Sequence, residues 1–297
     1  MSDEDGIDAR LPAVADRRLP RYACDTHNHV FGPFQQFPLI HPPDYAVPRA
    51  PLPVYLEMLD RVGLDRGVLV QPTQQGLDLT PMLHALNAGG GRLRGVGAAD
   101  AATTDEQLQQ MHAAGVRGLR FVEAASPTGA RRPGAVGFQD IAVMAPRMRQ
   151  LGWSINVWAR LPDLMQHLDA VLAPGLPVVF EHMGMLDVAR RISDPDFQRM
   201  LALLREGRIW IKLSVCRCST QAPGYADLRP QADALVEANP RHLLWGSDWP
   251  FIRMHGREPD AGQLVDLACD WLGEAPLVQS IFVDNPAALY QFGSTSP

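Results

Sequence analysis

Three short segments of the sequence combine imidazole and carboxylate side chains in patterns that could support catalysis. His27 and His29 stand two residues apart at the end of an apolar run, and Glu181-His182 and Ser247-Asp248 end two later runs. Two histidines at this spacing on a strand point to the same side of it. If that strand lines a barrel, both imidazoles enter one cavity.

The residue types allow two kinds of chemistry for His27, His29, His182 and Asp248. Neutral imidazoles and a carboxylate are ligands that suit zinc or manganese. The same groups could act without a metal, with the histidines donating hydrogen bonds and Asp248 acting as a base. The simplest alternative is that His27 and His29 are loop residues facing solvent. The spacing alone does not decide among these readings.

The elements that must position these side chains alternate between strand and helix. Helical patterns run over 54–62, from Thr104 to Ala114 with a capping box between Thr104 and Gln107, and over 163–172 and 197–204. Between them lie eight β-like runs: Tyr22–His27, Gly67–Gln71, Leu93–Ala98, Gly118–Phe121, Ser154–Trp158, Val178–Glu181, Ile209–Leu213 and Leu243–Gly246.

This alternation predicts right-handed crossovers and a parallel sheet. An open doubly wound sheet usually has a glycine-rich phosphate turn after its first strand, and His27-Asn28-His29 occupies that place here. Eight units in 297 residues favour a single-domain α/β fold, a (β/α)8 TIM-like barrel over residues 22–297. In such a barrel the chemistry gathers where the carboxyl ends of the strands meet the βα loops.

Further polar and aromatic residues fall at these strand ends or in the loops after them. Arg120 ends an apolar strand, where its charge needs either a protein carboxylate or an anionic substrate; we favour the substrate. Arg217 follows the seventh strand and is a second candidate. The long loop after the fourth strand holds Arg131 and Arg132. Residues that line the pocket or merely pack beside it are Tyr45, Gln71, Thr73 and Trp158.

Composition and charge exclude several classes of protein. The net charge is −6 and no stripe of basic residues is present, so nucleic acid is not an expected partner. No apolar run reaches the roughly 18 residues of a membrane span. Residues 1–21 are charged and lack a signal-peptide core, so we expect a flexible N-terminal arm and a cytoplasmic protein. The sequence does not give the oligomeric state.

At its catalytic motifs the sequence resembles the amidohydrolase superfamily, in its amidohydrolase-2 branch. The H-x-H of the first strand, Glu181-His182-Met183-Gly184 and Trp245-Gly246-Ser247-Asp248-Trp249-Pro250 carry this resemblance. The run from Asp25 to Pro33, with Val70-Gln71-Pro72 and 117–121, is similar to the family of 2-pyrone-4,6-dicarboxylate, muconolactone and sugar-acid lactonases. The similarity extends from about Tyr22 to Phe292.

The resemblance implies a distorted barrel that hydrolyses a carboxylated lactone, a small anionic substrate. Asp248 would be the general base, while His27, His29 and His182 would polarise the carbonyl and stabilise the oxyanion. Arg120 and Arg217 would hold a substrate carboxylate. No cofactor is expected from the pyrone lactonases, although decarboxylases of the branch hold zinc with comparable residues.

The sequence differs from the pyrone lactonases at three places, and two other activities are alternatives to lactone hydrolysis. Met185 and Trp158 stand where the pyrone lactonases have arginine and tyrosine, and Arg131 or Arg132 aligns only loosely with a loop arginine of that family. The alternatives are a zinc-dependent decarboxylase or amidohydrolase, and a lactone isomerase. A barrel that only binds a ligand is disfavoured, because buried, unpaired polar groups are costly.

Overall fold

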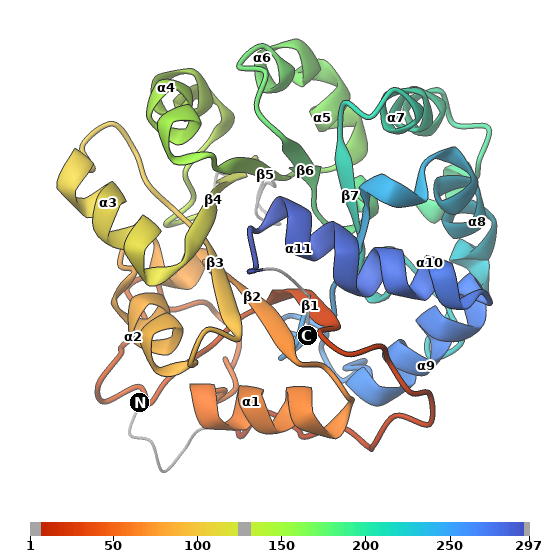
Figure 1. The fold of residues 1–297 in the computed structure, drawn as a ribbon, viewed down its shortest axis with the longest axis horizontal. Coiled ribbons are helices and arrows are strands. Elements are labelled where there is room, and N and C mark those ends of the chain that lie inside the picture. The colour runs from red at the N-terminus through yellow and green to blue at the C-terminus, as the bar shows by residue number, and fades with distance from the viewer. Residues whose placement is uncertain (1–6, 124–131, 294–297) are drawn as a thin grey trace.

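The protein is a closed barrel of parallel strands surrounded by helices (Figure 1). The computed structural model describes residues 7–123 and 132–293. In this part of the chain eight strands form one sheet in the order β1 to β8. They are β1 Cys24–Asn28, β2 Arg66–Val70, β3 Leu93–Gly97, β4 Val116–Val122, β5 Ser154–Trp158, β6 Val178–Phe180, β7 Trp210–Leu213 and β8 Leu243–Trp245.

The barrel closes between its first and last strands. Asn28 forms a parallel bridge with Trp249 just beyond β8. The Asp248 N–H donates to the His27 carbonyl at 2.8 Å, and the His29 N–H donates to the Trp249 carbonyl at 2.9 Å. The predicted (β/α)8 barrel is confirmed, and each predicted strand lies within two residues of an observed one at either end.

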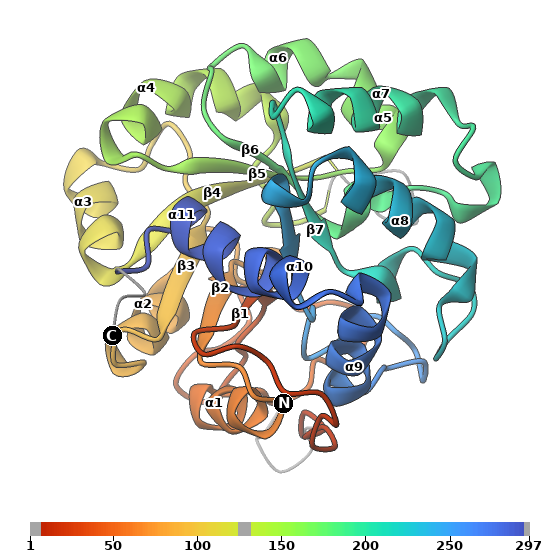
Figure 2. The same ribbon diagram turned by 45° about the vertical axis from the view of Figure 1, so that its right-hand side comes forward.

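Helices cover the outside of the barrel between successive strands (Figures 1 and 2). Parallel strands covered on both faces are buried throughout, as the residues of β1, β5 and β6 are here. The helices are α1 Leu52–Arg61, α2 Thr80–Ala88, α3 Asp105–Ala114, α4 Ile141–Leu151, α5 Leu161–Gln166, α6 Leu168–Leu172, α7 Pro195–Arg205, α8 Arg229–Ala238, α9 Ala261–Leu272, α10 Ala275–Gln279, a π-helix Ser280–Asp284 and α11 Asn285–Leu289.

One helix prediction is confirmed in detail, and another differs from the structure. The predicted capping box is present: Thr104 Oγ1 accepts from the Gln107 N–H and Gln107 Oε1 accepts from the Thr104 N–H. The single helix predicted over 163–172 is divided into α5 and α6 by His167, whose φ of −97° and ψ of 5° leave the helical region.

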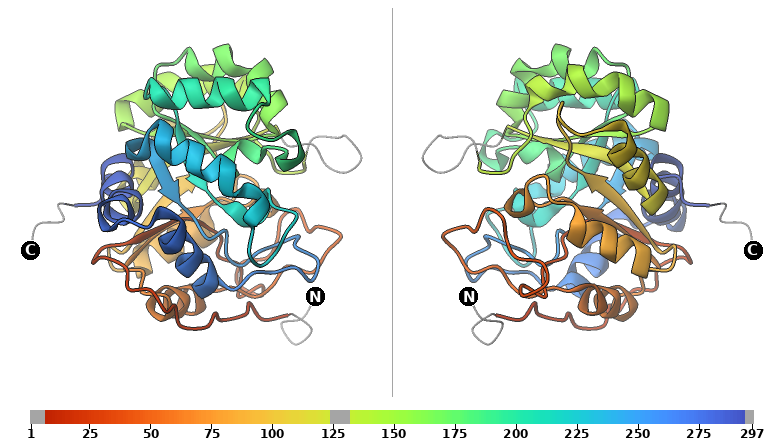
Figure 3. Two further views of the ribbon diagram at one scale, coloured as in Figure 1. Left: turned by 90° about the vertical axis from the view of Figure 1, so that its right-hand side faces the viewer. Right: turned by 90° about the vertical axis from the view of Figure 1, so that its left-hand side faces the viewer.

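The two ends of the barrel differ in what covers them (Figure 3). Leu289, Tyr290 and Phe292 close the amino end, where they pack against interior residues such as Cys24 and Val179. The long loop after β1 lies at the opposite end, where the strands finish. The C-terminal segment therefore forms a hydrophobic floor, and the polar residues collect above it.

The N-terminal segment lies against α9 and the end of β8. The Ala13 N–H donates to Asp260 at 2.9 Å, and the Arg17 N–H donates to Asp266 at 2.7 Å. Trp249 Nε1 donates to the Arg10 carbonyl at 3.2 Å. Whether residues 1–21 form a flexible arm stays a prediction. Among the described residues, no helix has both the length and the apolar character needed to cross a membrane.

Candidate active site

The seam between β1 and β8 places His27, His29 and Asp248 together. The backbone bonds across this seam hold the turn after β8 directly against β1. Gly246 makes the close approach possible, because a Cβ at that position would lie 2.7 Å from the Cβ of His27. The φ of Asp248 is 65°, and that of His182 is 50°. Non-glycine residues rarely adopt such values, and they concentrate at functional sites.

A buried carboxylate, Asp25, ties the two motifs to each other. It accepts hydrogen bonds from the N–H and hydroxyl of Ser247 at 2.8 and 2.7 Å, and from the His27 N–H at 3.1 Å. Tyr55 donates a further bond to it at 3.3 Å. Burial raises the pKa of Asp25 to about 6, and these donors limit the rise. Asp25 therefore holds the backbone at His27 and at Ser247 in a fixed relative position.

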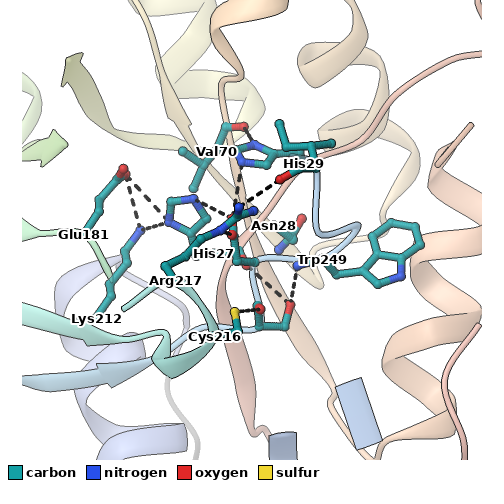
Figure 4. Close-up of polar contacts among 12 residues, drawn as sticks. His27, Asn28, His29, Val70, Glu181, Lys212, Cys216, Arg217 and Trp249 are labelled. Atoms are coloured by element: carbon teal, nitrogen blue, oxygen red, sulfur yellow. Dashed lines mark hydrogen bonds and ion pairs between the residues drawn. The ribbon is translucent and has the colours of Figure 1, made fainter. Parts of the chain in front are cut away.

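The four predicted catalytic side chains converge, and Figure 4 shows two of them, His27 and His29, side by side. Asp248 Oδ1 lies 3.6 Å from His27 Nε2 and 3.6 Å from His29 Nε2. The ring of His182 lies 4.4 Å from that of His27, centroid to centroid. The structure thus brings together residues that stand more than 200 positions apart in the sequence.

All three histidines are buried and held neutral. Burial lowers the pKa of His182 to about 3 and holds the pKa of His27 well below its ordinary value. The pKa of His29 is also lowered by burial, although Asp248 opposes the shift. Neutral imidazoles each carry one N–H donor and one acceptor, so their tautomers determine what they can do.

The hydrogen bond to Val70 fixes the tautomer of His29. Its Nδ1 lies 2.7 Å from the Val70 carbonyl oxygen, which only accepts, so Nδ1 carries the proton. The lone pair of His29 Nε2 therefore faces the carboxylate of Asp248. Two acceptors held 3.6 Å apart are suited to a species that donates to both.

Asp248 is paired with Arg217, whose Nε donates to Oδ2 of the carboxylate. Nη1 of Arg217 also donates to the Ile252 carbonyl at 2.8 Å. Burial alone would raise the pKa of Asp248, but the positive charge of Arg217 holds it far below its usual range. The carboxylate is therefore ionised, and it is a weak base as long as Arg217 remains its partner.

Arg120 has a protein partner in the structure. Its Nε and Nη2 donate to Oε2 of Glu181 at 3.0 and 2.8 Å, and Nη1 donates to the Gln71 carbonyl at 3.1 Å. Of the two partners that the sequence allowed, the protein carboxylate is the one observed. Burial would raise the pKa of Glu181, but Arg120 and Lys212 lower it overall.

A cluster of three arginines surrounds the indole of Trp158. The Cζ atoms of Arg120, Arg132 and Arg253 lie 4.9, 5.3 and 4.8 Å from the ring centroid. Arg132 Nε, Arg253 Nε and Trp158 Nε1 are buried without a hydrogen-bond partner among the described residues. Burial lowers the pKa of Arg253 to about 10, and the neighbouring Arg132 and Arg217 add to the effect. Such a set of cations and donors is suited to an anion.

The other predicted substrate-binding residues lie at different distances from this centre. The ring centroid of Tyr45 lies 6.4 Å from that of His255, and the Tyr45 hydroxyl accepts a hydrogen bond from the Gln74 amide. Burial raises the pKa of Tyr45 in spite of the nearby arginines. The Gln71 amide donates to the carbonyls of Gly76 and Asp78, so it holds a turn. Thr73 begins the same turn, Thr73–Gln75. Arg131 lies outside the described residues.

Within the part of the chain that the structure describes, two groups of side chains could hold a metal ion. His27, His29 and Asp248 form one, and His27, Glu181 and His182 form the other, each with ligand atoms within 4.8 Å of one another. His29 has the arrangement of a ligand, because its Nδ1 donates to a carbonyl and leaves Nε2 free. His27 does not, since its Nδ1 lies 3.4 Å from the Nζ of Lys212.

The sequence-based site omitted Lys212, Arg253, Asp25 and Glu181. Lys212 is the only lysine among the 27 basic residues of the chain, and it lies at the end of an apolar strand, which was a signal that it is functional. Glu181 belongs to the E-H-M-G motif, in which only His182 was predicted to be catalytic. Asp25 begins the motif that runs to Pro33, and Arg253 follows the motif that ends at Pro250, but nothing in their spacing indicates which way their side chains point.

The family model described as Amidohydrolase matches residues 24–292. The chain belongs to the amidohydrolase family. It is 34% identical over 289 residues to 2-pyrone-4,6-dicarboxylate hydrolase of Comamonas testosteroni, covering 94% of this chain and 93% of the relative. It is also 34% identical over 276 residues to 4-sulfomuconolactone hydrolase of Rhizobium radiobacter, covering 92% and 91%.

Among solved structures, a probable 2-pyrone-4,6-dicarboxylic acid hydrolase from Acinetobacter baumannii with citric acid bound superposes with a TM-score of 0.79. The two are 27% identical, and the match covers 91% of this chain and 100% of that one. The expected enzyme class, a lactonase-type hydrolase of the amidohydrolase family, is confirmed by the family match and by the hydrolase names of the first two relatives.

Proposed function

We propose that this enzyme hydrolyses the ester of a cyclic lactone that carries at least one anionic group. A pyrone dicarboxylate, a muconolactone or a sugar-acid lactone would be of this class. The observation that carries the proposal is the placement of the buried Asp248 within 3.6 Å of both His27 and His29, beside an arginine cluster. The names of the relatives, and the citric acid bound to the Acinetobacter protein, support an anionic substrate.

The arginines around Trp158 would bind the acidic groups of the substrate. Five cations of the site, Arg120, Arg132, Arg217, Arg253 and Lys212, outnumber its three buried carboxylates, Asp25, Glu181 and Asp248, and the three histidines are neutral. An anionic lactone offsets this excess of positive charge and satisfies the unpaired arginine donors. Guanidinium groups hold carboxylate or sulfonate oxygens through charge-assisted hydrogen bonds.

The attacking water would lie between Asp248 Oδ1 and His29 Nε2. Both atoms are acceptors, so the water can donate one hydrogen to each while its lone pair faces the lactone carbonyl carbon. The water oxygen bonds to that carbon, and its proton passes to Asp248. The tetrahedral intermediate then breaks the ring C–O bond, and the leaving oxygen takes the proton back from Asp248.

His27 and His182 would stabilise the oxyanion. His27 Nε2 and His182 Nδ1 are both buried without a hydrogen-bond partner among the described residues. An N–H held in a buried site and aimed at the carbonyl oxygen stabilises the charge that develops there, without reorganisation of solvent. Both rings are neutral, so each can donate its one N–H to the oxyanion. Neither ring carries an extra acidic proton that it could pass to Asp248.

Arg217 would couple substrate binding to the strength of the base. As long as it donates to Asp248, the carboxylate is too weakly basic to take a proton readily. A substrate carboxylate that draws Arg217 to itself would remove this partner and raise the pKa of Asp248. The base would thus become active when a substrate with the right charge is bound.

Screening a panel of lactones with and without added zinc tests the proposal. The panel contains pyrone dicarboxylate, muconolactones and aldonolactones, each assayed before and after chelation, with product mass as the readout. A product that has gained one water, formed equally well after chelation, supports the hydrolase. Activity that chelation abolishes and zinc restores favours the zinc-dependent decarboxylase or amidohydrolase, and a product of unchanged mass favours the isomerase.

A further inference from the structure

Lys212 lies at the bottom of the site and has no part in the mechanism above. It extends from β7 into the barrel, and its side chain is wholly buried. Its Nζ lies 3.4 Å from His27 Nδ1 and 3.9 Å from Glu181 Oε1, between the two (Figure 4). Below it, the ring of Tyr290 lies 5.9 Å away, and the C-terminal floor separates it from solvent.

Burial lowers the pKa of Lys212 to about 8, and the nearby carboxylates oppose the shift, so the side chain is a cation at pH 7. The carboxylate of Glu181 is within ion-pairing distance, and the face of the Tyr290 ring favours positive charge. The use of lysine here is also specific, since every other of the 27 basic residues in the chain is arginine. An ammonium is a compact charge with three donors, whereas a guanidinium is a planar fork that needs more room.

An ammonium beside His27 determines the tautomer of that ring. Because an ammonium has donors and no acceptor, His27 Nδ1 must accept, and the ring proton must be on Nε2. The other neighbour of Nδ1, Glu181 Oε1, would favour the opposite tautomer, but it is 3.7 Å away, beyond an ordinary hydrogen bond. His29 has the reverse arrangement, with its proton on Nδ1.

We propose that Lys212 is a positioning residue that holds His27 in the Nε2–H tautomer, so that the H-x-H pair offers a substrate one donor and one acceptor and binds metal poorly. A metal-bound histidine needs its lone pair on the ligating nitrogen and an acceptor beside the other one. His29 meets this requirement and His27 does not. The tautomer and the metal affinity stand on geometry alone; only the link to catalysis rests on the lactone hydrolysis proposed above.

Nitrogen NMR of the wild-type protein tests the tautomer without any substrate. With ¹⁵N-labelled lysine and histidine, the single lysine gives one side-chain signal, and the His27 ring signals are identified by their loss in His27→Gln. At pH 7 we expect an ammonium signal from Lys212, a proton on Nε2 of His27 and a proton on Nδ1 of His29. A neutral amine, or a His27 ring protonated on Nδ1, overturns the proposal whether or not the protein opens lactones.

The variant Lys212→Met tests the consequence for metal binding. Removing the ammonium frees His27 to turn its proton toward Glu181, so zinc affinity measured by calorimetry should rise about tenfold or more, in line with the effect of partners beside a metal ligand. Lys212→Gln keeps an N–H donor and should stay near the wild-type zinc affinity. Arg208→Met, which removes an exposed cation near the start of β7, is the matched control and should change nothing.

Turnover of a lactone substrate completes the test. In Lys212→Met the kcat should fall about tenfold or more while KM changes less, because the oxyanion donor and not the arginine cluster is disturbed. Lys212→Gln should restore part of the loss. Unchanged zinc affinity and an unchanged His27 tautomer in a folded Lys212→Met protein contradict the proposal. If that variant does not fold, the wild-type spectrum decides.

Discussion

Arg217 donates a hydrogen bond from Nε to Oδ2 of Asp248. The arginine proposed to bind a substrate carboxylate is therefore paired with the aspartate proposed as the general base. The same carboxylate presents its other oxygen, Oδ1, to His27 and His29 at 3.6 Å. Asp248 therefore stands between a cation that suppresses its basicity and the place where a water would be activated. The proposed reaction requires the balance between these two sides to change when substrate binds.

Asp248→Asn should reduce kcat by about 10²-fold or more, the order expected for the loss of a general base. The amide keeps the shape of the side chain and can still accept from Arg217, so the fold should persist. The measurement is steady-state turnover of the best lactone, with thermal unfolding as the control for folding. Near-normal turnover in a folded variant would remove Asp248 from the mechanism.

Substrates that lack one acidic group should lose kcat and not only affinity. If no carboxylate draws Arg217 away, Asp248 keeps its partner and stays a weak base, and truncated substrates are known to lose kcat in this way. The comparison is between a dicarboxylate lactone and its monomethyl esters. A change confined to KM, for each ester, would show that Arg217 binds substrate without controlling the base.

The barrel and its four central residues could be predicted because one principle governs both. A (β/α)8 barrel brings the carboxyl ends of all its strands to one rim, so His27, His182 and Asp248 had to converge once the strands were counted. The partners of the charged residues follow from side-chain directions that periodicity does not give. The pairing of Arg120 with Glu181, and of Arg217 with Asp248, could therefore be seen only in the structure.

The contacts of Lys212 also could not be predicted from the sequence. Its rarity was visible in the sequence, but its neighbours come from β1, from the end of β6 and from the residue after α11. No spacing rule joins three elements so far apart. The division of the helix at His167 was also not predictable from amphipathic spacing, which continues through it.

Arg253→Gln should raise KM for an anionic lactone by about ten- to a hundredfold, because a hydrogen bond to a charged group contributes about 1.5–3 kcal/mol. Arg253 lies over Trp158 within the arginine cluster, where its Nε has no partner among the described residues. Arg257→Gln, at an exposed position in the same loop, is the matched control and should leave KM unchanged. Equal effects of the two substitutions would count against the arginine cluster as the substrate site.

Gly246→Ala should lower both stability and turnover. The new Cβ would lie 2.7 Å from the Cβ of His27 and 3.0 Å from its backbone nitrogen, so β1 or β8 must move. Overpacking of this kind destabilises a fold by about 1–3 kcal/mol. Denaturant unfolding and kcat are the measurements, and Gly224→Ala, where a Cβ meets nothing within 4 Å, is the control. A variant with wild-type stability and kcat would show that the seam tolerates the extra atom.

The stability of the protein should fall as the pH is lowered from about 6.5 toward 3, and His182 should account for part of the slope. The pKa of His182 is about 3 in the folded protein against 6.5 ordinarily, because the side chain is buried. Between these values the unfolded chain binds a proton at this position and the folded protein does not, so acid favours unfolding. Above pH 6.5 the contribution is constant.

Asp25 acts in the opposite direction, and His182→Asn separates the two. The pKa of Asp25 is raised from 3.8 to about 6, so between these values the folded protein binds the extra proton and acid favours folding. His182→Asn removes only the histidine effect. Denaturant midpoints measured between pH 7 and 4 should therefore fall less steeply in the variant, while the exposed His255→Asn should follow wild type. Parallel curves for wild type and His182→Asn would show that this imidazole is not held neutral by burial.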